Sequence, residues 1–319
     1  MTEARASLQK ALTELAEGTR NLSGRSLQEF SDLDSASLDA VSAAWARIPS
    51  DRKRMLLDGL RQLSDESTLV SFDELARLLL ADRESQIRAR AIRLLDESHD
   101  PKLVAPFIKI LTGDADAETR AEAATALGRY VELGELEEIP APLYHQVEDA
   151  LLRTANGEDA IAVRRNALES LGYSGRQEVM TLIESAFRRE NPDWQASALF
   201  AMGRSSDERW EDHVLSRLDD LNPVVRLAAV EAAGQLRLAA ARPLLFEVLE
   251  DEDEDEISSA ALWSLSQIGG EDARLYLQNL LDLAEDEEQV QFLEDALDNL
   301  EFTDELNRFD LMSIDPDQE

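Results

Sequence analysis

The sequence predicts an all-α protein, a right-handed α-α superhelix in which pairs of helices stack one after another. Three observations lead to this fold class. Hydrophobic residues make up 44% of the 319 residues but aromatic residues only 5%, and the abundant alanine and leucine favour helix packing over sheets. One sequence pattern recurs along most of the chain. A second helical stretch separates its copies, and two such helices must stack to bury their apolar faces.

The recurring pattern starts with an apolar residue, usually followed by arginine, and has alanine four positions after the start. Its copies begin at Ile87, Thr119, Val163, Trp194, Val225 and Ile257, at intervals of 32, 44, 31, 31 and 32 residues. The alanines are Ala91, Ala123, Ala167, Ala198, Ala229 and Ala261. This near-constant interval predicts tandem repeats, in which each copy forms the second helix of a pair.

The first helix of each pair is predicted between the copies, where apolar residues recur at i, i+3, i+4 and i+7. These stretches are Lys102–Leu111, Pro142–Leu152, Val179–Phe187, Trp210–Leu218, Ala241–Leu249 and Asp272–Leu281. The second helices are expected to end in left-handed caps near Gly128, Gly172, Gly203 and Gly234. The 44-residue interval contains an insertion, predicted as a loop or a lengthened turn around Glu132 to Pro142. Pro140 and Pro142 cannot lie inside a helix, although Pro142 can start one.

The two ends of the chain differ from the repeats. Helical patterns at Ser35–Arg47, Asp51–Leu63 and Phe72–Leu80 predict an N-terminal helical cap. We therefore divide the chain into a cap at 1–81, tandem repeats at 82–302 and an acidic, frayed C-terminal tail at 303–319.

The repeat resembles a known family. The segment from Val225 to Gly234 (VRLAAVEAAG) looks like the second helix of HEAT repeats of the phycobilisome-lyase-like type. The segment Ser197 to Asp207 (SALFAMGRSSD) and the whole layout resemble bacterial HEAT-repeat domain proteins. The resemblance implies a HEAT/armadillo-like solenoid.

The charge of the chain limits its partners. The net charge is −35, from 67 acidic and 32 basic residues, so nucleic acid and anionic membranes are disfavoured and basic proteins are favoured. The first ten residues are too charged for a signal peptide, and no stretch approaches the ~20 apolar residues that span a bilayer. We expect a cytoplasmic protein.

The sequence offers no set of catalytic, cofactor-binding or metal-binding residues. It has no cysteine, no Gly-Lys pair and no GxGxxG motif. Asp251, Asp253 and Asp255 resemble half of a calcium loop, but the remaining ligand positions do not match. The deoxyhypusine hydroxylases, a HEAT-repeat family, hold di-iron with repeated His-Glu pairs. Here His99, His145 and His213 lack that neighbour, and we expect them at the surface or in turns.

Arginine recurs at one repeat position, at Arg88, Arg120, Arg164 and Arg226. We expect a structural ladder in which these side chains pair with the Asp or Glu of neighbouring turns, such as Asp82, Asp114 and Asp220, and tie the repeats together. The alternative is a row that recognises acidic partners.

A second repeat position predicts a binding strip. Two residues after each recurring alanine the side chain should point away from the packed stripe, into the concave face. Its occupants include Arg93, Glu169, Phe200, Glu231 and Trp263. Exposed aromatic residues flanked by charge are typical interface anchors. The alternative is that the aromatic rings tuck against the next repeat.

The sequence therefore favours a non-catalytic scaffold or adaptor that binds a protein or peptide with basic and apolar anchors on its concave acidic face. The repeat type also implies an alternative, a subunit of a chromophore-lyase-like enzyme. A structural spacer without a groove ligand is the third possibility. The oligomeric state stays open.

Overall fold

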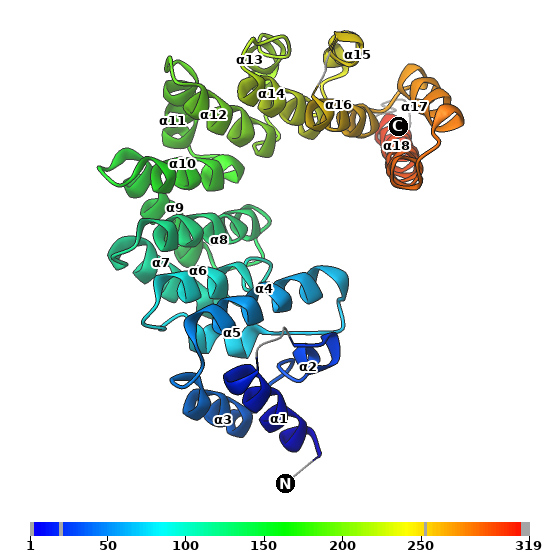
Figure 1. Ribbon diagram of the computed structural model, residues 1–319. Helices are drawn as coiled ribbons and strands as arrows, with labels where there is room; N and C mark the ends of the chain where they lie inside the picture. Colours follow the sequence, from blue (N-terminus) through cyan, green and yellow to red (C-terminus); the bar gives the residue numbers. More distant parts are fainter. Residues whose placement is uncertain (1–2, 19–21, 252–253, 314–319) are drawn as a thin grey trace. The chain divides into compact units, whose positions relative to one another are not determined.

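The computed structural model describes residues 3–18, 22–251 and 254–313. These residues form eighteen α-helices and four 3-10 helices, and none of them forms a strand. The all-α prediction is confirmed. The contacts divide the chain into two compact units, residues 1–170 and 171–319, which are described separately (Figure 1).

Unit 1 is a stack of helix pairs that follows two N-terminal helices, one of 15 residues and one of 5. Its helices are α1 (Glu3–Glu17), α2 (Gly24–Gln28), α3 (Ser35–Trp45), α4 (Ser50–Glu66), α5 (Asp73–Leu79), α6 (Ser85–Arg93), α7 (Val104–Gly113), α8 (Ala117–Glu135), α9 (Ala141–Asn156) and α10 (Ile161–Ser170). The second helices form a row in which α4 packs against α6, α6 against α8 and α8 against α10. Helix α5 packs against α6 in the same way as α7 packs against α8. One helix pair therefore extends across the predicted boundary between the cap and the repeats at 81/82.

Unit 2 continues the same pairing. Its α-helices are α11 (Gln177–Phe187), α12 (Pro192–Arg204), α13 (Glu211–Leu215), α14 (Pro223–Gln235), α15 (Arg242–Asp251), α16 (Asp255–Ile268), α17 (Glu271–Leu283) and α18 (Glu287–Ser313). The second helices α12, α14, α16 and α18 pack in a row, and α13 and α15 lie on one side of α14 and α16 (Figure 1).

The recurring residues form the core of both units. All six repeat alanines have an exposed fraction of 0%, which lets neighbouring helices approach closely. Side chains cap the helices that begin at the pattern. Asp116 accepts a hydrogen bond from the Thr119 N–H, and Asn191 and Asn222 cap helices whose first residue is proline, a position that proline favours.

The recurring glycines do not cap their helices, so that expectation is wrong. Gly203 and Gly234 lie inside α12 and α14. A Cβ on Gly234 would lie 2.8 Å from the Ser264 Cα on α16, and one on Gly128 would lie 3.3 Å from the Ser170 Cα on α10. Glycine therefore recurs because the second helices cross one another closely, not because of its backbone freedom.

After three of these helices, a residue other than glycine adopts the left-handed backbone conformation. Glu137, Ser206 and Arg237 have φ angles of 58°, 51° and 51° and follow α8, α12 and α14. The N–H groups of Glu138 and Leu238 reach back to carbonyls five residues earlier, at 2.8 and 3.0 Å, the longer hydrogen bond of a Schellman cap.

The insertion and the C-terminal segment contain more helix than predicted. Residues 132–135 continue α8, so only residues 136–140 form a turn before α9. The loop prediction is thus wrong for its first residues. The predicted tail is also helical at its start, because α18 runs to Ser313. Thr303 is buried and Asp304 pairs with Arg274 at 2.8 Å. Residues 314–319 lie outside the described part.

Candidate functional site

A groove along the second helices of unit 2 is the candidate site. Phe200 on α12, Glu231 on α14 and Trp263 on α16 occupy equal positions in three successive repeats. All three line one cavity of about 390 Å³, together with Glu256 and Phe292. The structure therefore brings these three predicted residues together, and we call this part the acidic end of the groove.

The two aromatic side chains are differently exposed. Trp263 has an exposed fraction of 37%, and its ring contacts Phe292 of α18 with centroids 6.4 Å apart. Phe200 is half-buried beneath the Arg204 guanidinium, 4.2 Å from the ring centroid. Each side chain lies about 200° around its helix from the buried alanine two residues earlier, which explains why both reach the groove.

The carboxylate between the aromatic residues belongs to Glu231, whose side chain is exposed at the groove. Desolvation by the surrounding protein raises the pKa of Glu231 above its ordinary value, and the negative charge of Glu256 raises it further. A cation bound here would gain two nearby carboxylates and relieve their mutual repulsion. The acidic end is therefore suited to a lysine or arginine side chain.

The groove continues into a region of opposite charge. A neighbouring cavity of about 480 Å³ shares Phe200, Gln235 and Gln267 with the acidic end. Its other lining residues include Tyr173, Arg204, Arg237 and Phe302, and no lining residue is Asp or Glu. We call this part the basic end. The expectation of an acidic concave face is wrong for this part of the groove.

The basic end combines guanidinium groups with aromatic rings. The Arg204 guanidinium carbon lies 4.2 Å from the Phe200 ring centroid and 5.1 Å from that of Tyr173, a cation–π arrangement that holds the side chain in place. Arg237 is exposed, and Phe302 has an exposed fraction of 59%. Such a surface favours a carboxylate or an apolar side chain of a ligand.

Sequence reasoning missed the basic end for a definable reason. Arg204 follows Phe200 by four residues and could have been found on the same helix face. Tyr173, Arg237 and Phe302 come from a 3-10 helix (Leu171–Tyr173), the turn after α14 and helix α18. They occupy no common repeat position, so periodicity carries no signal for them.

The two remaining strip residues belong to unit 1. Arg93 pairs with Glu118 at 3.2 Å and with Glu122, and Glu169 lies 4.0 Å from Arg165. These charges are neutralised within unit 1. They are not part of the groove formed by α12, α14, α16 and α18.

The recurring arginines connect consecutive turns. Arg88 donates from Nε and Nη2 to the Asp114 carboxylate at 2.7 and 2.6 Å and from Nη1 to the Asp82 carbonyl at 2.8 Å. Arg120 repeats this geometry with the Asp159 carboxylate, at 2.9 and 2.6 Å, and the Asp114 carbonyl, at 2.7 Å. Each side chain thus joins the turn before its own helix to the turn of the next repeat.

The other two members also bind a backbone carbonyl that precedes their own helix. Arg226 donates from Nη1 to the Asp220 carbonyl at 2.7 Å, and Arg164 donates from Nε to the Ala155 carbonyl at 3.2 Å. These contacts support the structural interpretation of the row.

The paired carboxylates titrate below their ordinary range. The hydrogen bond from Arg120 lowers the pKa of Asp159. Burial alone would raise the pKa of Asp114, but hydrogen bonds from Arg88 and from the Asp116 N–H outweigh burial and lower it.

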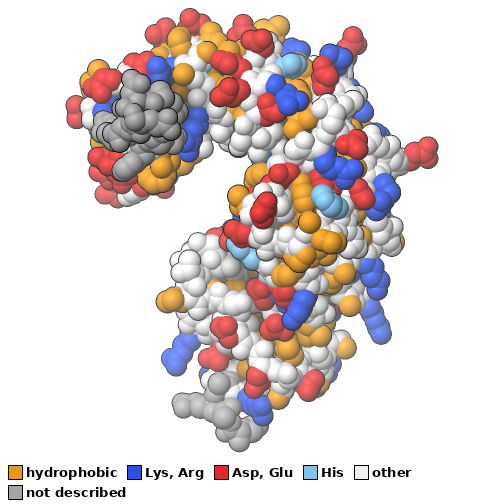
Figure 2. Space-filling view, turned by 180° about the vertical axis from the view of Figure 1, so that it is seen from behind, with side chains coloured by type: hydrophobic (Ala, Val, Ile, Leu, Met, Phe, Trp, Pro, Cys, Tyr) orange, Lys and Arg blue, Asp and Glu red, His pale blue; other side chains and the backbone are white. Residues whose placement is uncertain are grey.

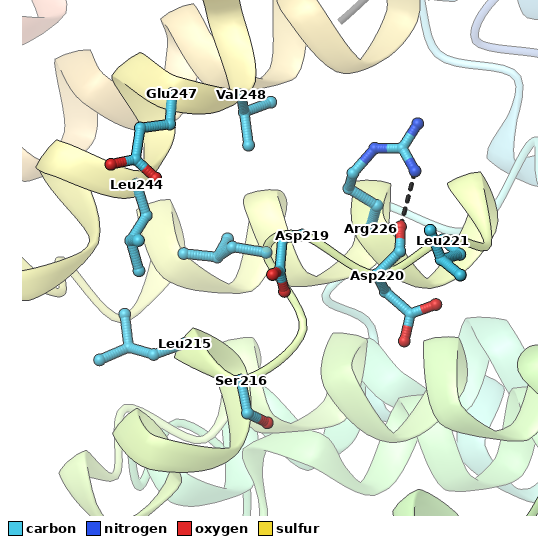
Figure 3. A pocket seen from close by; sticks show the side chains of 10 residues that line it. Leu215, Ser216, Asp219, Asp220, Leu221, Arg226, Leu244, Glu247 and Val248 are labelled. Carbon is cyan, nitrogen blue, oxygen red and sulfur yellow. Dashed lines mark hydrogen bonds between the residues drawn. The ribbon is translucent and has the colours of Figure 1, made fainter. Parts of the chain in front are cut away.

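A separate cleft lies between the first helices α13 and α15 (Figure 3). Its volume is about 710 Å³, and Leu215, Leu218, Leu244 and Val248 form aliphatic walls. Three carboxylate residues, Asp219, Asp220 and Glu247, also line it, with Arg226 bound to the Asp220 carbonyl. Sequence reasoning had placed Leu215, Leu218 and Val248 on helices but identified no cleft.

On one face of the protein, charged side chains are spread rather than gathered. In the space-filling view, Asp and Glu side chains are scattered among Lys, Arg and apolar groups (Figure 2). The net charge therefore does not by itself locate a site.

The histidines differ from one another in their surroundings. His99 is exposed, and His145 is bonded to the buried Glu148 at 2.9 Å. His213 packs between Phe187 and Trp210, with ring centroids 5.2 and 5.3 Å away, so the expectation of a surface histidine is wrong there.

The described residues contain neither a metal-ligand cluster nor a membrane span. Within these ranges, His, Asp and Glu form no group of three or more that could hold a metal ion. Asp253, from the calcium-like run, lies outside them. None of the described helices is long and apolar enough to cross a membrane.

Comparison with known proteins gives a family match. The family model for HEAT repeats matches residues 72–155 and 211–299. Human deoxyhypusine hydroxylase in complex with glycerol is similar over 83% of this chain and 96% of its own, at 18% identity and a TM-score of 0.35. An engineered protein is similar over 93% of this chain and 94% of its own, at 14% identity and a TM-score of 0.37.

A longer protein also shows similarity. Importin beta is similar over 92% of this chain but only 46% of its own, at 12% identity and a TM-score of 0.45. No curated protein matches the sequence.

Proposed function

Because this chain belongs to the HEAT repeat family, we propose that it is a non-catalytic, cytoplasmic scaffold that binds a partner protein along the groove of α12, α14, α16 and α18. Stacked repeats commonly bind partners along such extended surfaces. One observation carries the proposal. Phe200, Glu231 and Trp263 occur at equal repeat positions and line a single cavity, in a chain with few aromatic residues.

The groove determines the chemistry of its ligand. An extended or helical segment could place apolar side chains against Phe200 and Trp263, with a lysine or arginine between them beside Glu231 and Glu256. At the basic end, Arg204 and Arg237 would receive an acidic side chain of the same segment. The ligand is therefore an amphipathic segment with a basic residue near one end and an acidic residue near the other.

The two alternatives lead to different observations. A chromophore-lyase-like subunit would carry or transfer a tetrapyrrole, which visible absorption would reveal. A structural spacer has no groove ligand, so it would tolerate every groove substitution without loss of function. No feature of the groove specifically favours either alternative.

A random peptide display on the immobilised full-length chain tests the proposal even though the partner is unidentified. We expect enrichment of peptides with two apolar residues flanking lysine or arginine. Trp263→Ala should weaken the enriched peptides by about 2 kcal/mol, because aromatic anchors dominate such interfaces. No enrichment, or equal binding to Trp263→Ala, would contradict the proposal.

A matched tryptophan substitution controls for stability. Trp194 has an exposed fraction of 5%, against 37% for Trp263. Trp194→Ala should lose roughly 3–5 kcal/mol of unfolding free energy, whereas Trp263→Ala should change the melting temperature little. A large stability loss in Trp263→Ala would show that Trp263 is a core residue.

A further inference from the structure

The cleft between α13 and α15 has the features of a second docking surface, separate from the groove (Figure 3). Leu215 and Leu218 come from α13 and the turn after it, and Leu244 and Val248 come from α15. These helices are first helices of successive repeats. None of the four residues lines the groove of the second helices.

A short helix, α13, borders the cleft. It has 5 residues, Glu211–Leu215, whereas the preceding first helix α11 has 11 and α15 has 10. Residues 216–219 form turns after α13 instead of another helical turn. The cleft beside these turns has a volume of about 710 Å³.

The mouth of the cleft exposes apolar surface. The Leu221 side chain lines it with an exposed fraction of 98%, and the nearby Val224 has 48%. Leu221 makes the turn between α13 and α14 apolar at its tip, where a polar residue would be favoured in water. Exposed leucine beside an open aliphatic cleft is typical of a contact surface.

The charges at the rim of the cleft indicate which kind of ligand it would bind. Asp219 and Glu247 are exposed on the rim. Asp220 is paired with Arg217 at 3.0 Å, and Arg226 is oriented toward the Asp220 carbonyl. The two exposed rim carboxylates therefore favour a cationic ligand.

We propose that this cleft binds a basic amphipathic helix of a partner protein. A helix laid between α13 and α15 would insert leucine-like side chains at i, i+3, i+4 and i+7. Lysine or arginine residues beside that stripe would meet Asp219 and Glu247. The proposal is independent of the groove and makes the chain capable of holding two ligands.

The probe is a fluorescein-labelled peptide of leucine and lysine, long enough to form a stable helix, with leucine at the four stripe positions. A peptide of the same composition without the stripe serves as its comparison. Fluorescence anisotropy with the full-length chain at ~0.15 M salt should give at least tenfold tighter binding for the striped peptide. Equal binding of both peptides would show attraction by net charge alone and overturn the proposal.

Two double variants locate the binding. Leu221→Ser/Glu247→Gln changes exposed residues of the cleft and should weaken the striped peptide at least tenfold. Leu275→Ser/Glu285→Gln makes the same chemical changes at exposed residues outside it and should leave the affinity unchanged. Equal affinities for the two variants would refute the assignment. All four residues are exposed, so both variants should fold.

A fluorophore attached at one position in the cleft gives a second measure of peptide binding. The chain contains no cysteine, so Ser216→Cys, at the cleft, carries one environment-sensitive fluorophore. Binding of the striped peptide should shift its emission, while the same label at Thr181→Cys on the exposed surface of α11 should not respond. A response at position 181 alone would place the peptide elsewhere.

Discussion

At the scale of single residues, one arginine position carries contacts that link neighbouring repeats. The Arg88–Asp114 and Arg120–Asp159 pairs are bidentate, and their carboxylates lie in turns of the following repeat. The Arg88 and Asp114 side chains have exposed fractions of only 15% and 7%. A pair that is this shielded is worth more than an ordinary surface ion pair.

The pH dependence of the unfolding free energy should reveal how much the ionised Asp114 contributes to stability. Its pKa is lowered in the folded chain, so its contribution is full above the ordinary aspartate pKa of about 3.9 and is lost as pH falls through the folded pKa. Asp114→Asn should therefore lose about 1–3 kcal/mol of unfolding free energy at pH 7. The difference from wild type should shrink below about pH 4.

Urea unfolding at several pH values measures this effect. Asp219→Asn is the matched control, because Asp219 is exposed, and it should change stability little at any pH. A constant difference between wild type and Asp114→Asn down to about pH 3 would show that the ion pair does not cause the loss.

At the scale of helices, the recurring glycines mark where the second helices cross. On Gly234 a Cβ would lie 2.8 Å from the Ser264 Cα, whereas on Gly113 it would meet nothing within 4 Å. Both glycines are in helices, so alanine improves helix propensity at both. The two sites differ in the space available to the methyl group, which is open at Gly113 and filled by α16 at Gly234.

Gly234→Ala and Gly113→Ala should therefore change stability in opposite directions. Gly234→Ala should cost about 1–3 kcal/mol because α14 and α16 must separate. Gly113→Ala should add about 0.4–1 kcal/mol by restricting the unfolded chain. Chemical denaturation gives both values, and a stabilising Gly234→Ala would contradict the close crossing.

At the scale of the whole molecule, the repeats divide into two compact units. Stability in repeat proteins arises mainly from each repeat and its immediate neighbours. A fragment that ends between units keeps its helix pairs, whereas a fragment that ends within a pair exposes an apolar face. The position of the cut should therefore matter more than the length removed.

The fragment 1–170 should fold by itself, with a helical circular dichroism spectrum and a cooperative urea transition. The fragment 1–156 lacks α10, which packs against both α8 and α9, and should be less stable or aggregate. If 1–170 is unfolded, or if both fragments have the same transition, the division into units has no energetic basis.

The sequence by itself determined the class of fold, the pairing of helices and much of the core. The recurring pattern, at intervals of 31 or 32 residues and once of 44, placed six alanines that the structure buries completely. It also placed Phe200, Glu231 and Trp263 at equal repeat positions. These features were predictable because helical periodicity specifies which side of each helix faces its neighbours.

Only the tertiary structure decided which residues of different repeats meet. The crossing of α14 and α16 requires Gly234 to be small, and the basic end of the groove joins Tyr173, Arg204, Arg237 and Phe302 from separate segments. The cleft likewise joins residues of α13 and α15, which come from two successive repeats. The physical reason is that these features depend on the distance and angle between packed helices, which no local sequence pattern encodes.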